Sequence, residues 1–264
     1  ACRPAQRFEA RGKRARCARK REAGAMAWPE VVIFDCDGVL VDSEVIALAE
    51  TRLALGEAGL HLSDEDVFDR FLGLSVEAIA RSAEKELGET LPASFPGDLT
   101  RRILASFENE LKGVAGIRQA LAGLGARVCV ASSSSPERIR RSLAAVGYAN
   151  LFEPNIFSAR AVERGKPDPD LFLFAARRMG APPEACLVIE DSVPGVQAAA
   201  AARMQVFGFT GGSHISGPAQ GERLSAAGAA LVFDDMTELP GIIRLRRESL
   251  LPASRGEGGR EAAG

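Results

Sequence analysis

The sequence predicts an α/β fold built on a parallel sheet, with a long helical segment inserted after the first strand. Short apolar runs rich in Val and Ile alternate with helix-sized segments, which is typical of parallel strands covered by helices on both faces. Between the first two runs, however, the chain has several amphipathic helical patterns and no strand-like run.

The expected strands are short and continuously apolar rather than alternating, because strands inside a parallel sheet are buried on both faces. We assign strands to residues 31–34, 128–131, 186–189, 205–209 and 231–233. Helices are expected at residues 136–146, 170–179 and 194–202. Two of these helices begin with proline, which suits a first helical turn because its backbone N–H groups have no partner within the helix.

The helical insert is about seventy residues long, whereas strand–helix connections in such folds usually have roughly 2 to 6 residues. We therefore predict a separate helical domain at residues 43–112 and a sheet domain formed by residues 29–42 and 113–243. The flanking segments lack apolar periodicity, so we predict a basic disordered arm at residues 1–28 and a disordered tail at 244–264. The helices of the insert are expected at 44–55, 63–72, 75–87 and 99–111.

The composition indicates a soluble globular protein. Of the 264 residues, 46% are hydrophobic and 26% are charged, which is enough apolar material for a core without disulfides or structural metal. No apolar run approaches the roughly 18 residues of a membrane-spanning helix, and no apolar signal core follows the N-terminal bases. We therefore expect a cytoplasmic protein with no membrane partner.

The formal net charge of −2 is unevenly distributed along the chain. Residues 1–25 contain nine Lys and Arg and two Glu, so the rest of the chain carries a net charge of −9. Such an arm could direct the chain to an organelle or bind nucleic acid through phosphates. Because the arm has no apolar periodicity and Met26 stands just before the first strand, we interpret it instead as a tail without function, read from a misplaced start.

The cysteines and histidines argue against a disulfide framework and against zinc. Five cysteines are an odd number, and none forms a Cys-x-x-Cys pair. Cys36, Cys129 and Cys186 lie in or beside apolar runs, as small buried side chains of a reducing compartment do. The chain has two histidines, too few for a Cys/His zinc site. One of them, His214, lies in a glycine-rich loop, and we expect it to face solvent or to line a site entrance.

Polar side chains follow the predicted strands at the edge where open parallel sheets bind ligands. Two aspartates follow the first strand, serines follow the second, and two acids follow the third, while a lysine precedes the helix that leads to the third strand. Because these segments meet at one sheet edge, we expect a single site there. Its residues are Asp35, Asp37, Ser132, Ser133, Lys166, Glu190 and Asp191.

The residue types of this site favour metal-assisted phosphate chemistry. Four crowded carboxylates raise one another's pKa unless a cation keeps them ionised, and hard oxygen ligands with open positions indicate Mg²⁺. Hydroxyls and an ammonium beside the metal would bind phosphate. Of two aspartates two residues apart, one could attack phosphorus and the other move protons. Taken singly, each motif has a plain structural explanation, such as a turn or a helix N-cap.

Four segments, in this order along the chain, resemble the four motifs of the haloacid dehalogenase superfamily, in its phosphatase and β-phosphoglucomutase-like branch. They lie at residues 34–44, 131–134, 165–170 and 189–196, and the match extends from about residue 31 to residue 240. The resemblance implies a Rossmann-like catalytic core and identifies the helical insert with the cap domain of that family.

The resemblance also implies roles for the two aspartates of the first motif. Asp35 would be the nucleophile and a Mg²⁺ ligand. Asp37 would be the acid/base, and its backbone carbonyl would also bind the metal. The true dehalogenases of the superfamily lack an acid at the position of Asp37, so its presence points to phosphoryl transfer.

The other motifs would bind the phosphoryl group and the metal. Ser132, Ser133 and Lys166 would hold the phosphoryl group, and Lys166 would also shield the charge of the nucleophile. Asp191 would bind Mg²⁺, and Glu190 would act on the metal directly or through water.

A loop of the insert resembles the cap loop that closes over the substrate in this family, although a plain helix–helix turn is an equally open interpretation. Val76 follows this loop where β-phosphoglucomutase has an arginine that grips a second phosphate. The nearest bases, Arg70 and Arg81, are expected to face solvent. The loop consists of Gly73, Leu74 and Ser75.

We therefore predict a Mg²⁺-dependent phosphatase that hydrolyses small phosphorylated metabolites, sugar phosphates in particular, through an aspartyl-phosphate intermediate. Two alternatives stay open. One is a sugar phosphomutase of the β-phosphoglucomutase type, and the other is a nucleic-acid-binding protein that uses the basic arm, with nucleic acid the less favoured partner. The chain is expected to be a monomer or a homodimer.

Overall fold

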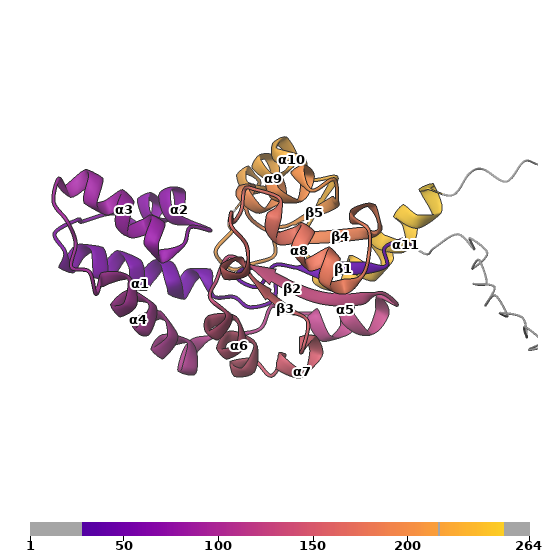
Figure 1. Cartoon of the computed structure of the whole chain (residues 1–264), viewed down its shortest axis with the longest axis horizontal. Coiled ribbons are helices and arrows are strands. Elements are labelled where there is room, and N and C mark those ends of the chain that lie inside the picture. The colour runs from indigo at the N-terminus through magenta and orange to yellow at the C-terminus, as the bar shows by residue number, and fades with distance from the viewer. Residues whose placement is uncertain (1–27, 216, 251–264) are drawn as a thin grey trace, which may run out of the picture.

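The fold is a parallel α/β fold, as predicted. A computed structural model describes residues 28–215 and 217–250, and its six parallel strands follow the order β3-β2-β1-β4-β5-β6 (Figure 1). The third strand was not predicted, because it has three residues and no apolar run marks it. The strands are β1 (Val31–Phe34), β2 (Arg127–Ser132), β3 (Ile156–Ser158), β4 (Cys186–Glu190), β5 (Gln205–Phe209) and β6 (Leu231–Phe233).

The central position of β1 determines which chain segments meet at the edge of the sheet. Phe34, the last residue of β1, lies opposite Val130 of β2 and Ile189 of β4, all in parallel register. The Asp35 backbone N–H donates to the Ile189 carbonyl over 3.0 Å, so the ladder continues for one residue beyond the strand. The loops after β1, β2 and β4 therefore leave the sheet side by side.

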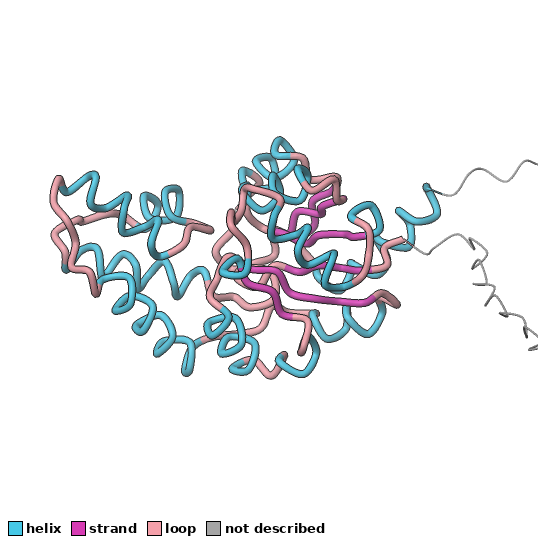
Figure 2. Tube along the Cα trace, viewed as in Figure 1, coloured by secondary structure: helices cyan, strands magenta, loops and turns pink. Residues whose placement is uncertain are grey.

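Helices cover both faces of the sheet (Figure 2). One apolar layer contains side chains of α5, α6, α7 and α11, and the other contains side chains of α8, α9 and α10. Residues of β1 point alternately into these two layers. The helices of the sheet domain are α5 (Ile117–Gly123), α6 (Pro136–Ala145), α7 (Ala149–Phe152), α8 (Asp170–Met179), α9 (Val193–Ala201), α10 (Ala219–Ala227) and α11 (Leu239–Leu250).

The insert between β1 and β2 begins with four helices that pack on one another. Their apolar core includes Leu55, Phe71, Ile103 and Phe107, each at most 3% exposed. We call α1 to α4 the cap helices. The exact domain boundaries proposed from the sequence stay a prediction. The cap helices are α1 (Glu44–Glu57), α2 (Asp64–Phe71), α3 (Val76–Leu87) and α4 (Phe95–Glu110).

The C-terminal part of the fold differs from the prediction. Residues 244–250, expected to be disordered, belong to α11, whose apolar side packs on the sheet through Leu239 and Ile243. Trp28, assigned to the disordered arm, instead packs against the core beside Phe207 of β5. The rest of the predicted arm, up to residue 27, and the tail from residue 251 lie outside the described residues. No helix in the described parts of the chain is long and apolar enough to cross a membrane. Cys36, Cys129 and Cys186 are buried free thiols, as predicted.

Candidate active site

The loop after β1 is held closely against the loop after β4. Gly38 has a φ of 78°, a left-handed conformation that glycine adopts without steric cost. A Cβ atom at this position would lie 1.9 Å from Oδ2 of Asp191. A glycine is therefore required here for the two acidic loops to approach each other.

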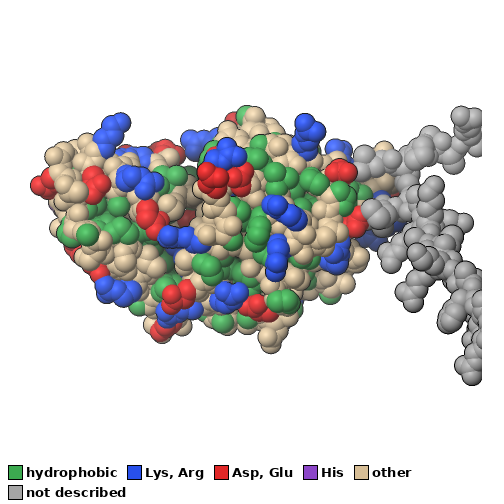
Figure 3. Space-filling model, viewed as in Figure 1, with side chains coloured by type: hydrophobic (Ala, Val, Ile, Leu, Met, Phe, Trp, Pro, Cys, Tyr) green, Lys and Arg blue, Asp and Glu red, His purple; other side chains and the backbone are tan. Residues whose placement is uncertain are grey.

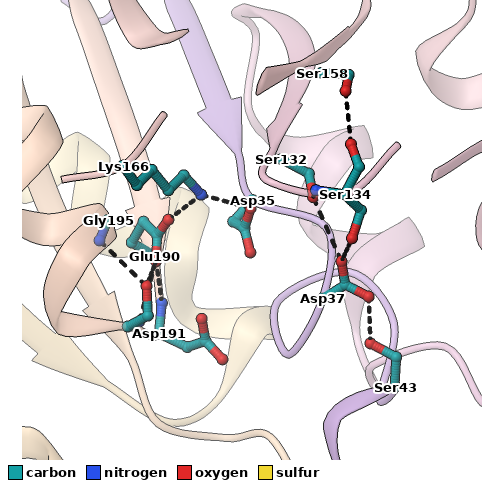
Figure 4. Close-up of polar contacts among 11 residues, drawn as sticks. Asp35, Asp37, Ser43, Ser132, Ser134, Ser158, Lys166, Glu190, Asp191 and Gly195 are labelled. Atoms are coloured by element: carbon teal, nitrogen blue, oxygen red, sulfur yellow. Dashed lines mark hydrogen bonds and ion pairs between the residues drawn. The ribbon is translucent and has the colours of Figure 1, made fainter. Parts of the chain in front are cut away.

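Lys166 connects two of the predicted site residues. Its Nζ lies 2.7 Å from Oδ1 of Asp35 and also bonds Oε1 of Glu190, and its side chain is 5% exposed (Figure 4). Burial alone would lower the pKa of Lys166, but the two carboxylates outweigh burial and raise it. The lysine is therefore a fixed positive charge at the sheet edge.

Glu190 is held by several donors besides Lys166. Its Oε2 accepts hydrogen bonds from the backbone N–H groups of Asp191 and Ser192, at 3.1 and 3.0 Å, and from the Ser192 hydroxyl at 2.9 Å. A Cβ atom at Gly195 would lie 1.9 Å from Oε1 of Glu190. With both oxygens already bonded, Glu190 is suited to hold Lys166 in place and to reach a metal through water.

Asp37 points away from Asp35 toward a group of donors (Figure 4). It accepts hydrogen bonds from the Ser43 and Ser134 hydroxyls, each over 2.7 Å, and from Nη2 of Arg138 over 2.9 Å. Burial by itself would raise the pKa of Asp37, but Arg138 and the two hydroxyls outweigh burial and lower it. Asp37 is therefore ionised in this arrangement.

Three carboxylates form a group that could hold a metal ion. One oxygen each from Asp35, Glu190 and Asp191 lies within 4.8 Å of the others. Burial raises the pKa of Asp35 well above its usual value, Lys166 opposes this shift, and the three neighbouring acids, Glu190, Asp191 and Asp37, reinforce it. A divalent cation would keep these groups ionised, and a set of oxygen donors suits Mg²⁺.

His214 is buried, so the expectation that it faces solvent is wrong. Its residue exposure is 8%, and its Nε2 lies 3.1 Å from Oδ2 of Asp191. Its ring lies 6.3 Å, between centroids, from that of Phe68 in cap helix α2. The loop after β5 folds over the acidic group and brings the histidine with it.

A cavity of about 500 Å³ lies between the cap helices and the sheet edge, where the surface is hollowed (Figure 3). Asp35, Asp37, Lys166 and Asp191 line it from the sheet side, together with Ser132 and Ser133. From the cap side it is lined by the predicted loop of Gly73, Leu74 and Ser75.

Three arginines also line this cavity. Arg81 is exposed, as expected, but it lies at the cavity wall as well. Arg81 belongs to α3, Arg138 to the first turn of α6, and Arg160 to the segment after β3. Arg160 pairs with Glu77 of the cap.

Sequence reasoning missed three polar partners of Asp37. Ser43 and Ser134 lie within the recognised motifs, but only neighbouring residues were assigned roles there. Arg138 follows Ser135, which caps α6 by accepting from the Arg138 backbone N–H at 3.2 Å. The usable signal is position: a first-turn residue of a helix that starts at the carboxyl edge of a strand faces the site.

Comparison with known proteins agrees with the fold and with the family that the motifs resemble. The sequence matches the haloacid dehalogenase-like hydrolase family over residues 29–203. It is 35% identical over 186 residues to a 6-phosphogluconate phosphatase from Escherichia coli K12, an alignment that covers 70% of this chain and 84% of the relative.

Solved structures resemble the chain over most of its length. A haloacid dehalogenase-like protein from Agrobacterium tumefaciens is 39% identical with a TM-score of 0.73, over 82% of this chain and 98% of that one. A hydrolase of the same family from Deinococcus radiodurans, solved with bound phosphate and sodium, is 33% identical with a TM-score of 0.67, over 86% and 100% of the two chains.

These matches define an α/β hydrolase with an acidic site at the sheet edge. The chain belongs to the haloacid dehalogenase-like hydrolase family, as the four motifs predicted. The predicted enzyme class, a phosphoric monoester hydrolase, is confirmed.

Proposed function

We propose that the chain is a Mg²⁺-dependent phosphatase of sugar phosphates that works through an aspartyl-phosphate. The observation that carries this proposal is the buried pairing of Asp35 with Lys166 beside Glu190 and Asp191. A carboxylate held next to a fixed ammonium and a candidate metal group can approach a phosphate dianion without repulsion. The similarity to a 6-phosphogluconate phosphatase supports the sugar-phosphate class.

In the proposed mechanism, an Asp35 oxygen bonds to phosphorus while the bond from phosphorus to the ester oxygen breaks. Asp37 gives a proton to the leaving oxygen and later takes one from the water that displaces Asp35. Lys166 and Ser132 hold the phosphoryl oxygens. The pairing with Arg138 favours the ionised form of Asp37, which is the form that takes the proton from water. Before the first step this pairing must therefore open and Asp37 must take up a proton from solvent, which it then gives to the leaving oxygen.

Asp35 and Asp191 would hold the Mg²⁺ ion, with the backbone carbonyl of Asp37 as a further ligand and Glu190 acting through water. The ion would supply neutralisation of the charge between Asp35 and the phosphoryl oxygens. The buried oxygen donors fit such an ion, because they need a cation to stay ionised together.

A phosphomutase is the second candidate, and the arginines of the cavity favour it. Val76 supplies no base in the cap loop, but Arg81 and Arg160 line the cavity and could bind a second phosphate. We nevertheless prefer water as the acceptor, because the relative with 35% identity is a phosphatase.

We expect the metal to decide activity. With a panel of sugar phosphates, EDTA should stop release of inorganic phosphate, Mg²⁺ should restore it, and Ca²⁺ should not, because calcium adopts higher and less regular coordination than octahedral Mg²⁺. The measurement is colorimetric phosphate release after chelation and addition of each ion. Full activity in metal-free buffer, or no release from any ester with Mg²⁺, would contradict the proposed function.

For Asp37→Asn we expect a loss that depends on the leaving group. Removing proton transfer should slow hydrolysis of alkyl phosphates by about 10²–10⁴-fold. Aryl phosphates should lose less, because their leaving groups need less protonation. The check is kcat for para-nitrophenyl phosphate and for an alkyl phosphate in both enzymes. Equal losses for the two esters would rule out the assigned role.

A further inference from the structure

Glu44 is a half-buried carboxylate of the cavity wall that has no role in the mechanism above. It is the first residue of α1 and follows Ser43, whose hydroxyl bonds Asp37. No donor among the described residues forms a hydrogen bond or ion pair with its carboxylate, and its oxygens are not sealed in apolar packing. Since Glu44 lines the cavity, its oxygens are free to accept hydrogen bonds from a molecule inside it.

Apart from Arg81, the other polar side chains of the cap wall are already engaged. The Thr51 hydroxyl donates to the Ala47 carbonyl over 2.7 Å, and the Thr100 hydroxyl donates to the Pro96 carbonyl over 2.8 Å. The second cap carboxylate of the cavity, Glu77, is paired with Arg160. Of the two cap carboxylates that line the cavity in the described part of the chain, Glu44 is therefore the one that a substrate can bind without breaking an ion pair.

The charges around Glu44 indicate what kind of group it binds. Burial raises the pKa of Glu44 to about 7, the carboxylates of Asp37 and Asp191 add to this shift, and Arg138 and His214 oppose it. A second anion placed here would be repelled by the carboxylates. Neutral hydroxyl groups are suited to this position, because they donate to a carboxylate without adding charge.

We propose that Glu44 is a specificity residue that accepts hydrogen bonds from substrate hydroxyls near the ester oxygen, and so selects polyol phosphates over phosphate esters without hydroxyls. The inference rests on the proposed phosphatase function and adds how the leaving group is recognised. Its position beside Ser43 and Asp37 places the recognised hydroxyls on carbons close to the phosphorylated one. A site built to bond a hydroxyl rejects analogues that lack it, because its polar group is then left unpaired.

The test compares 6-phosphogluconate with n-hexyl phosphate, which has a six-carbon chain and no hydroxyls. We expect the ratio of kcat/KM for the two esters to fall about 10–100-fold in Glu44→Gln, as expected for the loss of hydrogen bonds to a charged group. Most of this change should be weaker binding of the sugar ester, seen as a raised KM with little change in kcat. Glu57→Gln, at the exposed end of the same helix, is the matched control and should keep the wild-type ratio.

Several outcomes would overturn the inference. A wild-type ratio in Glu44→Gln, or equal losses for both esters, would mean that Glu44 does not read hydroxyls. The wild-type enzyme provides a test that does not depend on whether the variant folds. The inference requires a higher kcat/KM for 6-phosphogluconate than for hexyl phosphate, and the absence of this preference would overturn it. If wild-type enzyme with Mg²⁺ hydrolyses neither ester nor any of the sugar-phosphate panel, the proposed function itself fails, which is a different result from a lost preference.

Discussion

Replacing Asp35 with Asn is expected to abolish turnover and leave the fold intact. The amide has the shape of the carboxylate and can still accept a hydrogen bond from Lys166, so the buried packing is preserved. It cannot attack phosphorus as a carboxylate does, and it removes one negative charge from the candidate metal group. We expect kcat to fall on the order of 10⁴-fold or more, as when other covalent nucleophiles are removed.

Two measurements check this expectation. Rapid acid quenching with ³²P-labelled substrate should leave label on the wild-type protein and none on Asp35→Asn, while circular dichroism should show the same folded structure for both. Asp64→Asn, on the exposed surface of α2, is the control for the substitution itself and should keep wild-type turnover. A folded Asp35→Asn enzyme that releases phosphate at the wild-type rate would exclude the covalent mechanism.

The sheet and its reactive edge could be predicted because both leave local signals in the sequence. Buried parallel strands are continuous apolar runs, and the residues after them meet wherever the strands end in register. The pairing of Phe34 with Val130 and Ile189 meets this condition. Strand β3 gave no such signal, because three residues between a turn and a short helical segment carry too few apolar positions.

The polar environment of the site could be predicted only in part, because it depends on contacts between distant segments. Arg138 bonds Asp37 across 101 residues. Its place in the first turn of α6 indicates that it faces the site, but nothing near either residue indicates that the two side chains pair. His214 reaches Asp191 because the loop after β5 folds back over the acidic group. In the sequence, a histidine in a glycine-rich loop that folds over the site looks the same as a histidine in an exposed surface loop.

Replacing Lys166 with Met is expected to destabilise the fold as well as remove activity. Methionine keeps an apolar stem near Phe172 but leaves Asp35 and Glu190 buried without their cation. Breaking a buried pair by removing one partner typically costs about 3–5 kcal/mol of unfolding free energy. The measurement is urea denaturation of both proteins in EDTA, with exposed Lys85→Met as the control, for which a change within about 0.5 kcal/mol is expected.

The pH dependence of this loss distinguishes charge from packing. The pKa of Lys166 is raised, so its stabilising charge is present below the usual lysine pKa and is lost only as pH rises through the higher folded value. The lysine is thus charged throughout the acidic and neutral range. In that range it is the protonation of the neighbouring carboxyl groups that changes with pH. Burial already raises the pKa of Asp35, and losing Lys166 raises it further, so in Lys166→Met the carboxyls take up protons at acidic pH and no longer repel one another.

The gap in unfolding free energy between wild type and variant should therefore be smallest at acidic pH and widen toward neutrality, and Mg²⁺ should narrow it again at neutral pH. A gap that stays constant with pH would mean that Lys166 stabilises the fold through packing alone.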